Sequence, residues 1–172
     1  MKYTVSALLI LLSISIFGVR ISKKITFEQN VTGYLKRAAD ANTIELANQE
    51  LTKAINYLEA NNLTSGYTSV LYKTPDEEID FWYQNLKASQ KELSNLNSNS
   101  ALEKTNVLIK LRETLMDTGG KKMKVTLPQG LSVYPHNRFW AFLFSIVLFA
   151  SLISISFIIQ AENIKAKEIK AK

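Results

Sequence analysis

The segment that decides the fold class is "FWAFLFSIVLFASLISISFII", Phe139 to Ile159, a run of 21 residues without a charged side chain. About 20 helical residues cross the ~30 Å hydrocarbon core of a bilayer. The run also lacks a polar face that a core helix would turn toward water. The sequence therefore predicts a transmembrane helix at 139–159, followed by a short basic tail at 160–172.

A second uncharged run, "YTVSALLILLSISIFGV" from Tyr3 to Val19, stands near the N-terminus. It begins as a secretory signal does, with a lysine before an apolar core. A cleavage site needs small residues at the first and third positions before the cut, and Gly18 is preceded there by Ile16. We predict an uncleaved anchor within 1–24, with a signal peptide as the alternative.

Charge is distributed unevenly along the 172 residues, whose formal net charge is +6. Acidic side chains outnumber basic ones between 28 and 118, and basic residues adjoin both apolar runs. Basic residues beside a membrane span attract anionic headgroups, by about 1 kcal/mol per charge, so we assign them to lipid rather than to nucleic acid. Trp and Tyr side chains are also enriched at the headgroup level of a membrane. The predicted membrane-interface residues are Arg20, Lys23, Lys24, Tyr134, Arg138 and Trp140, with Lys121, Lys122 and Lys124 in the second basic segment.

The charges leave the orientation of the chain open. Arg20, Lys23 and Lys24 favour a domain on the cytoplasmic side, whereas the lysines of 160–172 favour a cytoplasmic C-terminus. Both cannot hold with two spans, and the intervening segment exceeds the ~60 residues within which loop charge sets topology. We predict cytoplasmic termini and a translocated domain.

Residues 25–118 are predicted to form a small antiparallel helical bundle between the two spans. Apolar side chains recur every three or four positions from 44 to 58 and from 108 to 115, the pattern of helices with one buried face. Asp40 and Asn42 compete for local backbone hydrogen bonds, so we expect them to bend or break the first helix.

Two helix starts are marked by capping boxes. Thr74 and Glu77 have the required spacing around Pro75, whose missing N–H costs nothing in the first turn. Ser100 and Glu103 repeat the spacing before the last helix of the bundle.

Phe81 is the residue whose position the helical pattern does not explain. Ile79 and Trp82 fall on one face of the helix, and Phe81 points to the opposite side. Two interpretations stay open: the preceding loop covers Phe81, or Phe81 is an exposed anchor for a partner or the membrane surface. We predict partner contact at Phe81, Tyr67 and Tyr72.

Residues 119–138 are predicted to form a short basic β-hairpin just before the second span. Apolar and polar residues alternate in "MKVTLPQGLSVYP" (123–135), with strands expected before Pro128 and after Gly130. The glycines at 119 and 120 are expected to end the preceding helix.

The second span contains two pairs of small residues four positions apart, Ala141/Ser145 and Ala150/Ser154. Such pairs allow two helices to approach closely in a membrane. We expect them to pack on the first span or on a partner.

Few residues indicate catalysis or metal binding. The chain has no cysteine and one histidine, His136, close to the second span. Asp76 and Asp80 could form a carboxylate pair or hold a cation, but residues of this kind at a helix start favour the helix dipole. We therefore assign no catalytic, cofactor-binding or metal-ligating residue.

Four segments resemble an uncharacterised family of small cyanobacterial membrane proteins: "LKRAADANTIELA", "GYTSVLYKTPDEEIDFWYQNLK", "EKTNVLIKLRETL" and "YPHN", between Leu35 and Asn137. The resemblance implies a plasma or thylakoid membrane and carries no activity, cofactor or catalytic residue.

The sequence thus favours a non-enzymatic membrane protein, a subunit, assembly factor or tether that presents a helical domain to a membrane-protein partner or to a second copy of itself. The alternative is a sensor that signals through a partner subunit.

Overall fold

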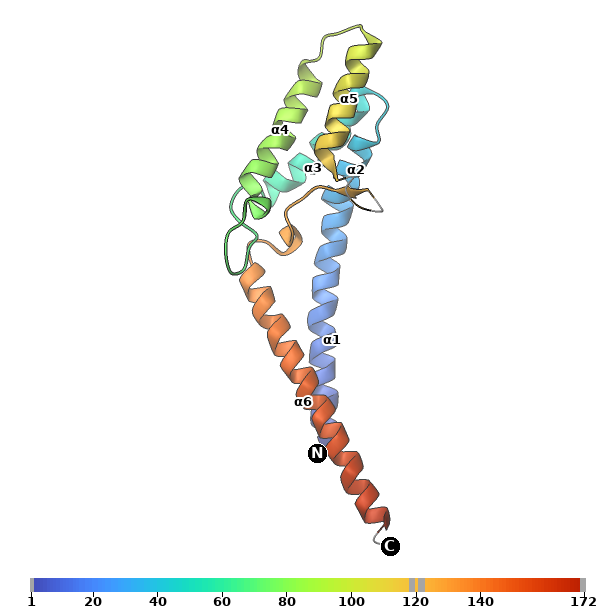
Figure 1. The fold of residues 1–172 in the computed structure, drawn as a ribbon, viewed down its shortest axis with the longest axis vertical. Helices are drawn as coiled ribbons and strands as arrows, with labels where there is room; N and C mark the ends of the chain where they lie inside the picture. Colours follow the sequence, from blue (N-terminus) through green and yellow to red (C-terminus); the bar gives the residue numbers. More distant parts are fainter. Residues whose placement is uncertain (1, 118–119, 121–122, 171–172) are drawn as a thin grey trace. The chain divides into compact units, whose positions relative to one another are not determined.

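The computed structural model describes residues 2–117, 120 and 123–170, and it is mainly helical as predicted (Figure 1). The chain divides into two compact units. One comprises Met1–Lys23 and His136–Lys172, and the other comprises Lys24–Pro135.

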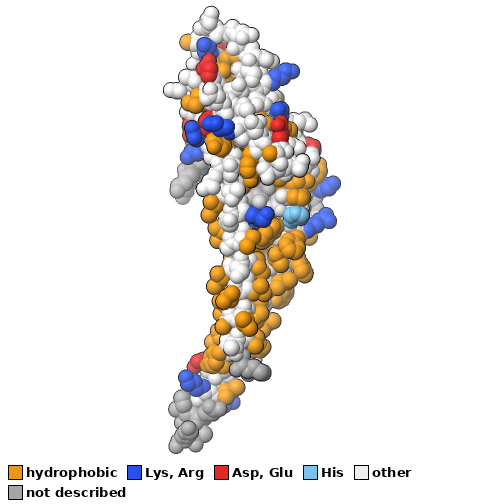
Figure 2. Space-filling view, turned by 180° about the vertical axis from the view of Figure 1, so that it is seen from behind, with side chains coloured by type: hydrophobic (Ala, Val, Ile, Leu, Met, Phe, Trp, Pro, Cys, Tyr) orange, Lys and Arg blue, Asp and Glu red, His pale blue; other side chains and the backbone are white. Residues whose placement is uncertain are grey.

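The first unit contains most of α1 (Lys2–Phe27) and all of α6 (Asn137–Lys170). Among the described residues, two helices are long and apolar enough to cross a membrane by length and composition, one of them beginning at Tyr3 and the other at Asn137. Figure 2 shows their surface densely covered by hydrophobic side chains. The segment predicted as a basic tail continues α6 as far as Lys170.

α1 and α6 pack antiparallel within this unit. The rings of Phe17 and Phe144 meet edge to face, with centroids 6.0 Å apart. Closer to the start of α1, the Ser6 hydroxyl donates to the Ser154 carbonyl oxygen at 3.3 Å. The beginning of α1 therefore lies against the later part of α6.

The second unit is a helical bundle with a short strand pair. Its helices are the π-helix η1 (Glu28–Thr32), α2 (Gly33–Ala39), α3 (Ile44–Ala60), α4 (Ile79–Asn95) and α5 (Ala101–Leu115). α3 lies against α2 and α4, and α5 lies against α2 and α4 (Figure 1). Every residue from Lys2 to Ala39 is helical, so the chain passes from the first apolar helix into the bundle without a loop.

The predicted break between α2 and α3 is confirmed. α2 ends at Ala39, and Thr43 caps α3 by accepting the Leu46 N–H on its hydroxyl oxygen at 3.2 Å. The predicted cap at Ser100 is confirmed as well, since its hydroxyl oxygen accepts from the Glu103 N–H at 3.4 Å.

The core of the bundle is built from the predicted apolar stripes. In α3 every apolar residue of the predicted stripe is buried, and in α5 Leu111 and Leu115 are buried beneath a half-buried Leu108. α4 turns one face inward and leaves Phe81 in solvent. The residues of α3 and α4 buried in the core are Ile44, Ala47, Leu51, Ala54, Ile55, Leu58, Ile79, Trp82, Leu86 and Leu93.

A two-stranded antiparallel hairpin is present, but only one of its strands, β2, lies where a strand was predicted. β1 (Met116–Asp117) directly follows α5 and pairs with β2 (Lys124–Val125), Met116 opposite Val125. The segment expected to form the second strand is instead the 3-10 turn η3 (Leu131–Val133). Both of its apolar residues are buried there, so the turn satisfies the alternating pattern without a strand partner.

The end of α5 also differs from the prediction. The helix stops at Leu115, because the next two residues are extended and pair with β2. The predicted stop at Gly119 lies outside the described residues, as do Lys121 and Lys122 of the predicted basic segment.

Trp82 ties α4 to the segment that follows β2, and its replacement tests this link. The buried indole N–H donates to the Thr126 carbonyl oxygen at 2.8 Å. Trp82→Phe leaves that carbonyl unpaired, and we expect the bundle to lose about 1–3 kcal/mol. Amide hydrogen exchange of the detergent-solubilised chain measures the loss. Trp140→Phe on α6 is the matched control. Equal rates of amide hydrogen exchange in the bundle of both variants would refute the link between Trp82 and Thr126.

Candidate contact surface

The loop between α3 and α4 is closed at its base like a hairpin. The Ile79 N–H donates to the Gly66 carbonyl oxygen at 2.8 Å, and the Thr68 N–H donates to the Glu77 carbonyl oxygen at 3.0 Å. Between these bonds Tyr67 and Glu78 form an isolated antiparallel bridge. Residues 69–76 therefore form a short projection whose base is closed by hydrogen bonds.

This base explains why α4 begins later than the capping box predicts. Glu78 is extended in the bridge with Tyr67, so α4 starts at Ile79. Pro75–Glu77 forms the 3-10 turn η2, in which Thr74 makes no side-chain cap to the backbone. Its hydroxyl donates instead to the Glu77 carboxylate at 2.7 Å.

The acidic residue that matters most to the loop is Asp80. Its carboxylate accepts the Gly66 N–H at 2.8 Å, across the base of the projection. The structure therefore gives Asp80 a role in the fold. Among the described residues, no group of three or more His, Cys, Asp or Glu side chains could hold a metal ion.

The chain segment that leads to α6 contacts the loop at Ser65 and Gly66, through the side chain of Tyr134. The Tyr134 hydroxyl donates to the Ser65 carbonyl oxygen at 2.9 Å. Gly66 has φ +103°, and a Cβ atom at this position would lie 2.2 Å from the Tyr134 hydroxyl oxygen. Glycine is therefore required twice here, by the left-handed backbone and by the tyrosine above it.

The three residues predicted as partner contacts lie in different environments. Phe81 is 65% exposed and Tyr72 is 74% exposed, so the interpretation in which the preceding loop covers Phe81 is wrong. Leu71, beside Tyr72 at the tip, is 87% exposed. Tyr67 is half-buried, and the Lys73 ammonium lies 4.7 Å from its ring centroid. The loop thus exposes Leu71 and Tyr72 while holding Tyr67 inward.

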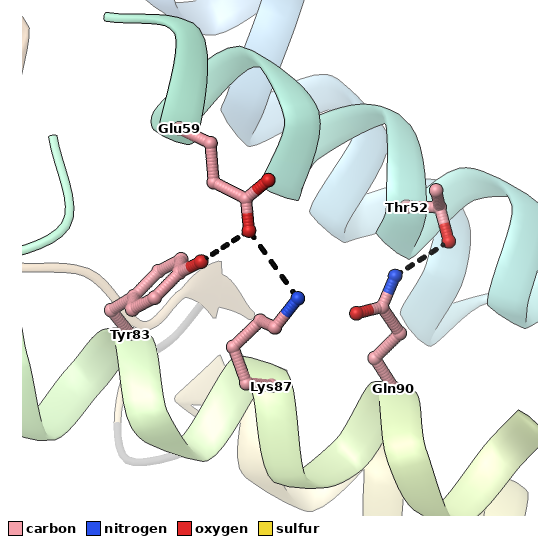
Figure 3. Close-up of polar contacts among 5 residues, drawn as sticks. All are labelled: Thr52, Glu59, Tyr83, Lys87 and Gln90. Atoms are coloured by element: carbon pink, nitrogen blue, oxygen red, sulfur yellow. Dashed lines mark hydrogen bonds and ion pairs between the residues drawn. The ribbon is translucent and has the colours of Figure 1, made fainter. Parts of the chain in front are cut away.

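α3 and α4 are joined on their outer side by a row of polar contacts (Figure 3). Glu59 accepts from the Tyr83 hydroxyl and from the Lys87 ammonium, the latter at 3.3 Å. One turn further along, the Gln90 amide donates to the Thr52 hydroxyl at 2.9 Å. Sequence periodicity did not single out these residues, because each pairs across two helices far apart in sequence.

The contact between Glu59 and Tyr83 shifts the pKa of each residue in the direction that favours the hydrogen bond between them. The hydrogen bond from Tyr83 and that from Lys87 lower the pKa of Glu59. Partial burial, followed by the hydrogen bond to Glu59, raises the pKa of Tyr83 to about 12. The pair is therefore most stable as a neutral tyrosine bound to an ionised carboxylate.

Glu50 is a buried charge that sequence analysis missed. Its side chain is 2% exposed, and its two oxygens lie 2.9 Å from Arg37 Nε and 2.7 Å from Lys53 Nζ. Arg37 belongs to α2, whereas Glu50 and Lys53 belong to α3. The carboxylate thus bridges two helices, and its place on the inner stripe of α3 was the available signal.

The predicted membrane-interface residues divide into exposed and packed side chains. Trp140 is buried and lines the same small hollow as Arg20, so α1 and α6 bring the two side chains together. Tyr134 packs on the bundle core. The charged members Arg20, Lys23, Lys24 and Arg138 are exposed, and Lys24 pairs with Glu28 at 3.7 Å.

The two small-residue pairs of α6 face in different directions. Ala150 and Ser154 are buried, and the Ser154 carbonyl accepts the Ser6 hydroxyl of α1. Ala141 is half-buried and Ser145 is exposed, its hydroxyl donating to the Ala141 carbonyl oxygen. The structure therefore places only the second pair in the helix–helix contact.

Comparisons with known protein families, with curated proteins and with solved structures found no match to this chain. The resemblance to a cyanobacterial family stays an expectation from the sequence.

The requirement for glycine at position 66 can be tested by adding one methyl group. We expect Gly66→Ala to cost more than about 1 kcal/mol, since alanine is strained at positive φ and meets Tyr134. Faster hydrogen exchange at Thr68 and Ile79 would report the opened base. Tyr134→Phe removes the nearest oxygen, so the double variant should lose less than the sum of the single losses. Strict additivity would exclude the contact.

The Glu59–Tyr83 pair predicts a pH dependence of bundle stability. Because the folded-state pKa of Tyr83 is raised from 10.0 to about 12, its contribution is complete below pH 10 and is lost as pH rises toward 12. The lowered pKa of Glu59 adds a contribution that is lost as pH falls below 4.5. The stability gap between wild type and Tyr83→Phe should therefore shrink in strong alkali. A gap independent of pH would contradict the pairing, and Tyr72→Phe is the exposed control.

Proposed function

We propose that the protein is a non-enzymatic integral membrane protein, a subunit, assembly factor or tether that presents its helical bundle to a partner protein. Two long apolar helices that pack antiparallel support an anchor in the bilayer, since each is long enough to cross it. Following the sequence resemblance, the membrane is a plasma or thylakoid membrane. The antiparallel pairing is consistent with both termini on the cytoplasmic side.

The observation that carries this proposal is the exposure of Phe81 on a firmly held helix. Its neighbours Ile79 and Trp82 are buried in the core, and Asp80 is bonded to the Gly66 N–H. The backbone at Phe81 is therefore already ordered, so only its side chain loses conformational entropy when a partner covers it. Exposed large aromatic residues are frequent centres of binding energy at protein interfaces.

A sensor is the second candidate, and one observation favours it. All residues from Lys2 to Ala39 are helical, so the first span continues into the bundle without a loop. A helix shared by two sites is the kind of physical link that coupling between them needs. The signal would then pass to a partner subunit in the membrane.

Recovery of a complex in mild detergent tests the leading proposal. We expect the tagged wild-type chain to retain a defined partner or a second copy of itself, and Phe81→Asp to reduce the recovered partner at least ~10-fold, which corresponds to about 1.4 kcal/mol. An exposed substitution of this kind should leave the fold within ~0.5 kcal/mol of wild type.

Leu102→Asp is the matched control, because Leu102 is 71% exposed on α5 and receives the same charge. Loss of the partner in both variants would indicate a general effect of charge. A wild-type chain that crosslinks to nothing in the intact membrane would reject the interaction proposal.

A further inference from the structure

We propose that the tip of the loop between α3 and α4, Val70 to Lys73, is a lipid-contact site that dips into the headgroup region of the membrane that holds α6. This inference rests on the membrane anchoring proposed above. It concerns the loop tip and is separate from the partner contact at Phe81.

The composition of the tip suits the membrane interface. Leu71 and Tyr72 are the two most exposed large hydrophobic residues of the second unit's described part, at 87% and 74%. Leucine inserts readily among acyl chains, and tyrosine prefers the headgroup level. Lys73 follows directly and is exposed, with its ammonium 4.7 Å from the Tyr67 ring centroid, so the tip also carries a positive charge that attracts anionic headgroups.

The tip, Val70 to Lys73, contains no carboxylate, and the acidic residues of the loop follow it along the chain. Asp76 is exposed in η2, whereas the backbones of Glu77 and Glu78 pair with those of Thr68 and Tyr67 at the base. Glu77 is further bound by the Thr74 hydroxyl, and Asp80 is bound by the Gly66 N–H. The projection is thus acidic from Asp76 to its base, and its tip is apolar with one lysine.

The base of the loop is bonded to a residue that is close in sequence to the start of α6. The Tyr134 hydroxyl donates to the Ser65 carbonyl oxygen, and Tyr134 is three residues before Asn137, where α6 begins. Three residues span at most ~10 Å, so only a short length of chain separates Tyr134 from the apolar helix. A water-exposed apolar tip on a loop bonded to this segment is of the kind that enters a lipid surface.

The rigidity of the base makes insertion inexpensive. Its backbone is already ordered by the two bonds to Gly66 and by the bond between Thr68 and Glu77. The tip therefore enters lipid without first having to be folded, which is the usual entropy cost of a flexible segment. Leu71 and Tyr72 need no other contact to be broken, since both are exposed in the isolated chain.

A spin label placed at the tip tests the proposal, and the cysteine-free sequence allows a unique attachment site. Leu71→Cys carries a nitroxide in the full chain, reconstituted in vesicles of phosphatidylcholine and phosphatidylglycerol. Its collision rates with oxygen, which concentrates in lipid, and with a water-soluble nickel chelate give its depth. Leu102→Cys is the matched control, because it replaces an exposed leucine in the first turn of α5, outside the loop.

We expect the label at 71 to favour oxygen over the nickel chelate at least ~10-fold more than the label at 102 does. Replacing Lys73 by Glu in the labelled chain should reduce this ratio in vesicles with phosphatidylglycerol and change it little in phosphatidylcholine alone. Free access of nickel to position 71 would place the loop in water and overturn the proposal. Protection of position 71 from both reagents would overturn it in favour of a protein occupant.

A third label separates failure of the loop from failure of the anchor. Phe149 is exposed on α6, within the apolar run. Nickel access at Phe149→Cys would reject the membrane anchor itself and with it the loop proposal. Oxygen access at 149 together with nickel access at 71 would reject only the loop.

Discussion

The structure of the second unit depends on the backbone of Gly66. Its N–H is bound by Asp80 and its carbonyl by the Ile79 N–H, so one residue fixes both the first turn of α4 and the base of the loop. Its missing side chain leaves the space that Tyr134 occupies. The bundle, the projecting loop and the segment leading to α6 therefore meet at a position where only glycine fits.

Much of the helical framework could be predicted because its causes are local. The stripe from Ile44 to Leu58 and the cap at Thr43 or Ser100 depend on residues within one or two turns. The hairpin could not be placed correctly, since Met116 reads as a continuation of α5 and its pairing with Val125 is decided in three dimensions. Thr74 was assigned as a cap for a similar reason, as nothing nearby shows that Glu78 is extended against Tyr67.

The candidate contact surface was predictable only in part. Helical geometry separated Phe81 from the buried face, but whether the loop covers it depends on where the loop's base is closed. Tyr67 and Tyr72 are similar in sequence context, yet one is held beneath Lys73 and the other stands in solvent. Periodicity cannot distinguish them, because neither belongs to a helix. The hydrogen bonds of the loop, rather than its composition, decide which of the two tyrosine rings is exposed for contact with another molecule.

The buried carboxylate of Glu50 has a consequence for the uniqueness of the fold. Apolar stripes such as those of α2 and α3 can slide by one turn and still bury comparable area, so hydrophobic burial alone selects among registers weakly. Sliding would separate Glu50 from Arg37 and leave one oxygen of the buried carboxylate without its partner, while Lys53 on the same helix keeps the other, so the competing registers lose a charged contact in the core. We infer that Glu50 contributes less to the stability of the native state than to the free-energy gap between the native register and the shifted ones.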